Sequence, residues 1–175
     1  MSKNIQLLTT KKIDRKVPSF LFASRLIREK GIIQFITAAE ELVSEGVKAK
    51  FLIAGLVDKD GVNPISEHLL QNRSIEWLGH RKDVPALIDK SRAVCLFSLY
   101  GEGVPRILLE SLARSTAIIT TNTPGCIELV DEGKNGILVS SRNITEIKQA
   151  FMTLIEEPRK AKRLGENGRR FLENV

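Results

Sequence analysis

The sequence contains few of the residues that build metal centres and disulfide frameworks. Among its 175 residues there are two cysteines, Cys95 and Cys126, and two histidines, His68 and His80. Two distant cysteines can supply neither a disulfide framework nor a four-ligand zinc site, and they fit a reducing compartment. Because two histidines also argue against a His-based metal centre, we expect no metal in this protein.

Long apolar runs are absent as well. No stretch approaches the ~20 apolar residues of a membrane span, and the start of the chain is not followed by the apolar region of a signal peptide. With 42% apolar and 27% charged residues, the chain is nevertheless too hydrophobic to be disordered. Its length predicts one domain with a substantial core.

Aromatic residues are scarce, at 5% of the chain, and the net charge of +6 is unevenly placed. Residues 1–16 carry five cations and one anion, and residues 159–175 carry six cations and two anions, so the body between them is slightly acidic. An acidic body without an aromatic stripe argues against nucleic acid as a partner. The basic ends are compatible with a peripheral contact with an anionic membrane surface. We expect a cytoplasmic location, with any such contact at the inner face of the membrane.

Short apolar runs alternate with helical patterns along most of the chain. Runs of strand length lie at residues 20–23, 51–54, 75–78, 93–97, 117–120 and 136–139. Helices are expected at residues 31–46, 63–71, 83–90 and 105–112, from 143 or 145 to 157, and from 158 onward, with one helical turn at 127–130. The alternation predicts an α/β fold with a doubly wound, Rossmann-like parallel sheet of about six strands and helices on both faces. Residues 1–16 are interpreted as a polar leader or linker and residues 17–175 as the domain.

Such sheets bind ligands beyond the carboxyl ends of their strands, so the residues after each strand form the candidate site. Arg25 and Lys30 follow the first strand. The loop after the fourth strand contains Gly101 and Gly103, which let a backbone approach a ligand, and Pro105 then opens a helix. The free N–H groups of that helix start, together with two cations, suit a diphosphate.

Two glutamates flank the expected phosphate position. Glu110 lies about a turn and a half into the helix, where its carboxylate can accept hydrogen bonds from the vicinal hydroxyls of a ribose. Glu102 lies in the loop and can face a second polyol. Phosphates between two sugars describe a nucleotide-sugar. Taken singly, these residues have simpler interpretations: Arg25 and Lys30 as solvated charges, Glu110 as a surface acid and Glu102 as a helix cap.

Five ordered segments resemble the group 1 (family 4) retaining glycosyltransferases. Glu102 and Glu110 have the E-x7-E spacing, and residues 102–110 (EGVPRILLE) are similar to the family block EG-x-P-x4-E. The other similar segments are 24–31 (SRL…EKG), 77–81 (WLGHR), 124–130 (PGCIELV) and 132–136 (EGKNG). The resemblance covers about residues 18–172. The sequence departs from the family pattern at Ser24, where glycine is usual, and at 113–117, where A-x-G-x-P is usual.

The resemblance implies the carboxyl-terminal, donor-binding half of a GT-B enzyme. It assigns the diphosphate to Arg25 and Lys30, the ribose to Glu110, the sugar and phosphate to Glu102, Gly103, Val104 and Pro105, and the surroundings of the base to His80 and Arg81. The expected catalytic residues are Glu102, Arg25 and Lys30, because the two cations can stabilise the leaving diphosphate. The nucleotide-sugar is then a substrate, and no cofactor or metal is expected. Asp58 and Asp60 match the D-x-D metal motif of another glycosyltransferase fold, but a turn is expected there.

The implied reaction is sugar transfer from a nucleotide diphosphate with retained configuration. A UDP-sugar is the favoured donor, and the acceptor is a lipid-linked or polysaccharide glycan of bacterial O-antigen (lipopolysaccharide) or capsule synthesis. The residues before the first strand are too few for the acceptor-binding domain, so we expect this chain to be half of a catalyst, inactive by itself. A non-catalytic nucleotide-sugar-binding fragment is one alternative. A nucleotide-sugar epimerase is another, although it would need catalytic acids and histidines that this spacing does not show.

Overall fold

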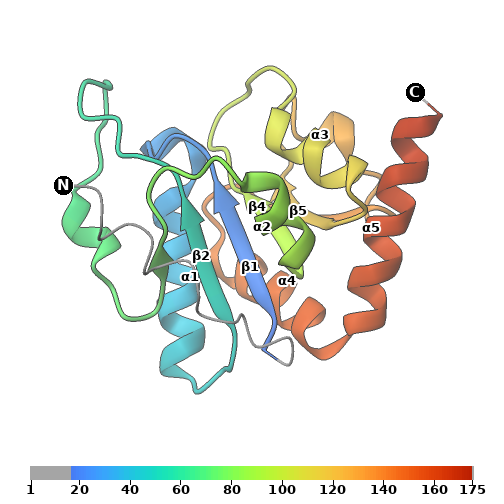
Figure 1. Cartoon of the computed structure of the whole chain (residues 1–175), viewed down its shortest axis with the longest axis horizontal. Helices are drawn as coiled ribbons and strands as arrows, with labels where there is room; N and C mark the ends of the chain where they lie inside the picture. Colours follow the sequence, from blue (N-terminus) through green and yellow to red (C-terminus); the bar gives the residue numbers. More distant parts are fainter. Residues whose placement is uncertain (1–16, 175) are drawn as a thin grey trace.

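A computed structural model describes residues 17–174, so the expected leader at 1–16 lies outside the described residues. Six strands form one sheet: β1 (Ser19–Ala23), β2 (Lys50–Ala54), β3 (Glu76–Trp77), β4 (Ala93–Leu96), β5 (Ala117–Thr121) and β6 (Gly136–Val139). The strand order is β3-β2-β1-β4-β5-β6, and every neighbouring pair is parallel (Figure 1). This is the strand order of a doubly wound Rossmann fold, which confirms the predicted fold class.

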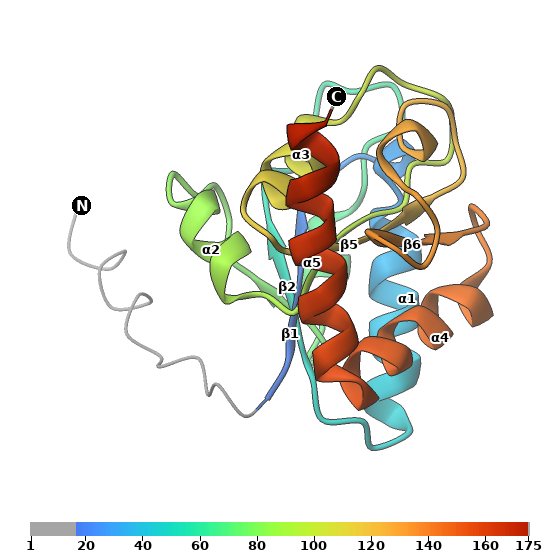
Figure 2. The same ribbon diagram turned by 90° about the vertical axis from the view of Figure 1, so that its right-hand side faces the viewer.

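Helices cover both faces of the sheet, as predicted. The α-helices are α1 (Ile32–Ser44), α2 (Val84–Lys90), α3 (Arg106–Ala113), α4 (Ile144–Glu156) and α5 (Pro158–Glu173). Three short 3-10 helices lie at η2 (Arg28–Lys30), η3 (Glu67–Leu70) and η4 (Ile127–Leu129). Helices α1 and α4 pack together on one face, and α2, α3 and α5 lie on the other (Figure 2). No helix in the described part of the chain is both long enough and apolar enough to cross a membrane.

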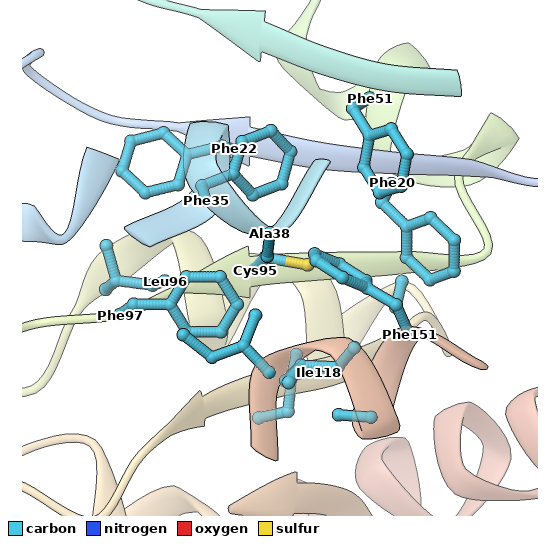
Figure 3. Close-up of a cluster of buried hydrophobic side chains, with 14 of the residues drawn as sticks. Phe20, Phe22, Phe35, Ala38, Phe51, Cys95, Leu96, Phe97, Ile118 and Phe151 are labelled. Atoms are coloured by element: carbon cyan, nitrogen blue, oxygen red, sulfur yellow. The ribbon is translucent and has the colours of Figure 1, made fainter. Parts of the chain in front are cut away.

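A cluster of phenylalanines fills the layer between the sheet and helices α1 and α4. Its members come from two strands, two helices and the loop after β4: Phe20, Phe22, Phe35, Phe51, Phe97 and Phe151. All are essentially inaccessible to solvent, and several pairs have edge-to-face geometry, such as Phe20 with Phe151 at 4.7 Å between ring centroids (Figure 3). Each buried phenylalanine stabilises the fold by about 1.5–3 kcal/mol. The strands whose carboxyl ends carry the site are therefore supported by a well-packed core.

The prediction of a helix at residues 63–71 is wrong. Asn63 does not cap a helix, because its side-chain amide donates to Glu29 Oε1 at 3.0 Å. Pro64 forms an antiparallel bridge with Ile27 instead of opening a helix. Only η3 is helical in this region, and its cap is Ser66, whose hydroxyl accepts from the amide of His68. The loop after β2 is therefore drawn against the loop after β1.

Candidate functional site

A cavity of about 410 Å³ opens beyond the carboxyl ends of β1 and β4. Arg25 and Lys30 line it from the β1 side, and residues 102–105 line it from the β4 side. The structure thus brings together the cations predicted to hold a diphosphate and the loop predicted to approach it. Arg106, which is not among the predicted site residues, lines the same cavity.

A second cavity of about 400 Å³ adjoins the first. Its walls include His80 and Arg81 from the loop after β3, and Gly55 and Leu56 from the loop after β2. The two cavities share four lining residues: Ala23, Ser24, Arg25 and Ile107. His80 and Arg81 therefore line the neighbouring cavity, whereas Lys30 and Glu102 line the first one. Arg25 lines both cavities.

The backbone around Lys30 is fixed by the loop after β4. The amide of Phe97 donates to the carbonyl of Lys30 at 3.3 Å, and the amide of Leu99 donates to the carbonyl of Glu29 at 2.9 Å. Gly31 has φ +78°, and a Cβ atom there would lie 2.1 Å from the carbonyl oxygen of Phe97. Only glycine allows this approach, which places the Lys30 ammonium at the cavity.

The carboxylate of Glu102 is held by two donors. Lys30 Nζ donates to Oε2, and the hydroxyl of Ser98 donates to Oε1. Ser98 is buried, and its own carbonyl accepts from the hydroxyl of Thr121 at 2.8 Å. The side chains of Lys30 and Glu102 are only 21% and 24% exposed, so this ion pair is partly shielded from water.

The loop after β5 supports the loop that carries Glu102. The amide of Glu102 donates to the carbonyl of Pro124 at 3.2 Å. Gly125 has φ +86°, and a Cβ atom there would lie 2.3 Å from the carbonyl oxygen of Glu102. Glu128 accepts from the amide of Gly125 at 3.3 Å. Gly125 is not among the predicted site residues, although a Pro-Gly pair shortly after a strand is a signal for such a turn.

Two arginines of the site pair with aspartates. Arg25 Nη1 lies 3.3 Å from Asp58 Oδ2, so the D-x-D segment supplies a partner for Arg25 and forms the expected turn. Arg81 binds Asp83 through two hydrogen bonds, of 2.7 and 2.6 Å. These hydrogen bonds raise the pKa of the Arg81 guanidinium and lower the pKa of the Asp83 carboxyl. Both groups of that pair therefore stay ionised at neutral pH, and Asp83 does not use its side chain to cap α2.

Among the residues predicted to bind the nucleotide-sugar, Glu110 is the one that lines neither cavity. Its Oε1 accepts from Arg106 Nε at 2.7 Å, one helical turn earlier on α3. The ribose role of Glu110 stays a prediction, and the contact that the structure shows is with Arg106.

A profile described as "Glycosyl transferases group 1" matches residues 7–171, which is most of the chain. The chain belongs to the group 1 glycosyl transferases. This confirms the family resemblance that was inferred from the five sequence segments.

Named relatives of this glycosyl transferase chain share between a quarter and a third of its residues. It is 28% identical over 155 residues to the "Capsular polysaccharide biosynthesis glycosyltransferase CapM" of Staphylococcus aureus, covering 87% of this chain and 40% of CapM. It is 29% identical over 157 residues to the "N,N'-diacetylbacillosaminyl-diphospho-undecaprenol alpha-1,3-N-acetylgalactosaminyltransferase" of Campylobacter jejuni, covering 89% of this chain and 40% of that protein. The chain therefore spans about 40% of the length of these relatives.

Solved glycosyl transferase structures share the fold. The crystal structure of HepE of Anabaena in complex with UDP-glucose matches with a TM-score of 0.78 and 23% identity, over 90% of this chain and 44% of HepE. The match to less than half of HepE agrees with the prediction that this Rossmann-like sheet is one half of a GT-B fold.

Proposed function

We propose that this chain is the nucleotide-sugar-binding part of a retaining glycosyltransferase, with a UDP-sugar as donor. The observation that carries the proposal is the convergence of Arg25, Lys30 and the start of α3 on one cavity at the carboxyl edge of the sheet. A diphosphate matches this arrangement in charge and in hydrogen bonding, because the guanidinium, the ammonium and free helix-start amides are all donors. The second cavity, beside His80 and Arg81, is the proposed place of the base.

In the proposed reaction, these donors stabilise the negative charge that grows on the leaving diphosphate. Arg25 and Lys30 carry full positive charges, and the amides at the start of α3 add the positive end of the helix dipole. Glu102, held between Lys30 and Ser98, is the carboxylate proposed to contact the sugar. The proposal assigns no protein nucleophile and requires neither a metal nor a cofactor.

The acceptor is proposed from the relatives. CapM is named for capsular polysaccharide biosynthesis, and the Campylobacter jejuni relative is named for a diphospho-undecaprenol substrate. We accordingly propose a lipid-linked or polysaccharide acceptor in bacterial surface-glycan synthesis, at the cytoplasmic side of the membrane. Because the chain spans about 40% of these relatives, we also propose that it binds donor but transfers no sugar when isolated.

Calorimetry of the 175-residue chain with UDP, GDP and ADP tests the donor site. We expect weak binding with a preference for UDP, unchanged by EDTA. Loss of one phosphate contact weakens binding about tenfold, equivalent to ~1.4 kcal/mol, so Arg25→Ala and Lys30→Ala should each show at least that loss. Lys48→Ala is the matched control, because Lys48 is exposed and precedes β2 at the opposite edge of the sheet.

Two results would contradict the proposal. A folded chain that binds none of the three nucleotides has no working donor site. UDP binding that is equally strong in Arg25→Ala, Lys30→Ala and Lys48→Ala would place the nucleotide elsewhere.

A further inference from the structure

A chain of buried hydroxyl groups connects the end of β5 to the carboxylate of Glu102. The hydroxyl oxygens of Thr121, the last residue of β5, and Thr123 lie 3.1 Å apart. The hydroxyl of Thr121 donates to the carbonyl of Ser98 at 2.8 Å, and the hydroxyl of Ser98 donates to Glu102 Oε1. Because Ser98, Thr121 and Thr123 are all buried, these groups depend on one another for hydrogen bonds.

The direction of the hydrogen bonds in this chain follows from the protons available. An ionised carboxylate can only accept, so the Ser98 hydroxyl must give its single proton to Glu102. Thr121 gives its proton to the Ser98 carbonyl, and Thr123 must therefore be the donor to Thr121. The chain is thus ordered from β5 toward the carboxylate.

Ser98 and Lys30 hold the same carboxylate in different ways. Lys30 Nζ donates to Glu102 Oε2, but its ammonium is carried on a flexible four-carbon stem and is also assigned to the proposed diphosphate. A carboxylate held by Lys30 alone would follow the ammonium as it adjusts to a phosphate. The Ser98 hydroxyl extends from a buried residue whose carbonyl is bonded to β5, so it gives Glu102 a fixed partner.

Glu102 keeps capacity to bind a ligand while both protein donors hold it. A carboxylate offers about four acceptor sites, and Lys30 and Ser98 occupy one on each oxygen. The side chain of Glu102 is 24% exposed, and the residue lines the first cavity. Its remaining acceptor sites suit the hydroxyl groups of a sugar in that cavity.

We propose that Ser98 is a positioning residue for the donor sugar, because its hydroxyl holds the Glu102 carboxylate in the orientation that accepts from sugar hydroxyls. The hydroxyl of Thr121 in turn holds Ser98. This inference rests on the proposed function, since it assumes that Glu102 contacts the sugar of a nucleotide-sugar. Ser98 is buried and lines neither cavity, so it acts through Glu102 and affects only ligands that carry a sugar.

Calorimetry of the 175-residue chain with UDP and with UDP-sugars tests this role. The measured quantity is the affinity for a UDP-sugar divided by the affinity for UDP. The sugar is whichever of glucose, galactose and N-acetylglucosamine gives the UDP-sugar that the wild-type chain binds most tightly. A hydrogen bond to an ionised group changes an affinity about tenfold, so Glu102→Ala should lower the ratio by about that factor. Ser98→Ala should lower it about fivefold, because the carboxylate remains but is misplaced, and should change UDP affinity by less than about twofold.

A double-mutant cycle shows whether Ser98 acts through Glu102. Adding Ser98→Ala to a chain that already carries Glu102→Ala should lower the ratio no further, because the carboxylate to be positioned is gone. Ser19→Ala is the matched control and should leave the ratio unchanged. Ser19 is also buried, its hydroxyl donates to the carbonyl of Lys90 at 3.2 Å, and it lies at the amino end of β1, opposite the site.

Thr121→Val provides a second variant, and it decides the test if Ser98→Ala does not fold. It removes the hydroxyl that holds the Ser98 carbonyl and leaves the Ser98 side chain in place. The ratio should fall in the same direction as in Ser98→Ala.

A loss of the ratio in Ser98→Ala that disappears in the Glu102→Ala background supports the inference. An unchanged ratio in Ser98→Ala, or a loss that adds fully to that of Glu102→Ala, overturns it and leaves the proposed donor site intact. Equal losses of UDP and UDP-sugar affinity also overturn it, because they indicate general structural damage. A folded wild-type chain that binds UDP but none of the UDP-sugars overturns the sugar contact of Glu102 as well. One that binds neither overturns the inference together with the proposed function.

Discussion

Gly125 lies where two loops of the site are in close contact, and it fits there because it has no side chain. Its φ of +86° is one that side-chain-bearing residues rarely adopt, and the carbonyl oxygens of Glu102 and Gly103 lie 2.3 and 2.8 Å from where a Cβ atom would stand. The loop after β5 can therefore rest directly on the backbone that presents Glu102. Gly46 has nearly the same φ, +85°, but nothing lies within 4 Å of its Cβ position.

This pair of glycines separates backbone strain from steric contact. Gly46→Ala should cost about 1–2 kcal/mol of unfolding free energy, because alanine is strained at positive φ. Gly125→Ala should cost at least ~2 kcal/mol more, since the two loops must also move apart. It should weaken UDP binding as well, while Gly46→Ala should leave that affinity unchanged. Urea unfolding measures the change in stability, and calorimetry measures the change in UDP affinity. Equal losses of unfolding free energy in the two variants would show that the close contact between Gly125 and Glu102 does not affect stability.

The residues of the site differ in how readily the sequence reveals them. Arg25 and Lys30 could be predicted, because the carboxyl end of a strand already fixes their edge of the sheet. Asp58 as the partner of Arg25 could not, since the two are 33 residues apart and meet only when two loops fold together.

Helix α4 is an element whose start is well defined by side chains. Asn143 Oδ1 accepts from the amide of Glu146 at 3.1 Å, and the carboxylate of Glu146 accepts in return from the side-chain amide of Asn143, also at 3.1 Å. Glu146 also accepts from the amide of Ser140 at 2.5 Å, and this bond connects the residue that follows β6 to the start of the helix. These contacts resemble a capping box, in which the first and fourth residues satisfy each other's groups.

Removal of the cap should weaken α4 by a predictable amount. Asn143→Ala should lower the unfolding free energy by about 1 kcal/mol, the usual cost of losing a side-chain cap. Asn143→Asp should retain most of the stability, because its carboxylate can accept the same amide hydrogen bond. Thr145→Ala, at an exposed position in the first turn, is the control and should have little effect. A loss no larger in Asn143→Ala than in Thr145→Ala, measured by urea denaturation, would contradict the role of the cap.

The contrast between α4 and the region after β2 explains which elements could be predicted. At α4, the cap residue and the apolar spacing point to the same helix, and the structure contains it at Ile144–Glu156. At residues 63–71, Asn63 and Pro64 also form a local helix-start signal, but contacts with Glu29 and Ile27 use them otherwise. Local signals fail where a loop is held by partners that are distant in sequence.

At the scale of the whole molecule, the core that supports the site also contains an ionisable group. Cys95 lies on β4 at the centre of the sheet, among the phenylalanines of the core, and is inaccessible to solvent (Figure 3). Burial raises the pKa of the Cys95 thiol well above its usual range, because a thiolate would lose its hydration there. The folded chain therefore keeps this proton at a pH at which the unfolded chain releases it.

This difference predicts a loss of stability in alkaline solution. Below the thiol pKa of the unfolded chain, about 8.5, both states hold the proton and Cys95 adds no pH dependence. Above it, the unfolded state binds fewer protons than the folded state, so the unfolding free energy falls by up to about 1.4 kcal/mol per pH unit until the folded-state pKa is reached. Urea unfolding between pH 7.5 and 10, under reducing conditions, should therefore show a steeper decline for the wild-type chain than for Cys95→Ala. All other ionisable groups are common to both chains, so the difference between the two slopes isolates the thiol. Parallel pH profiles would mean that Cys95 is not protected from ionisation by the folded core.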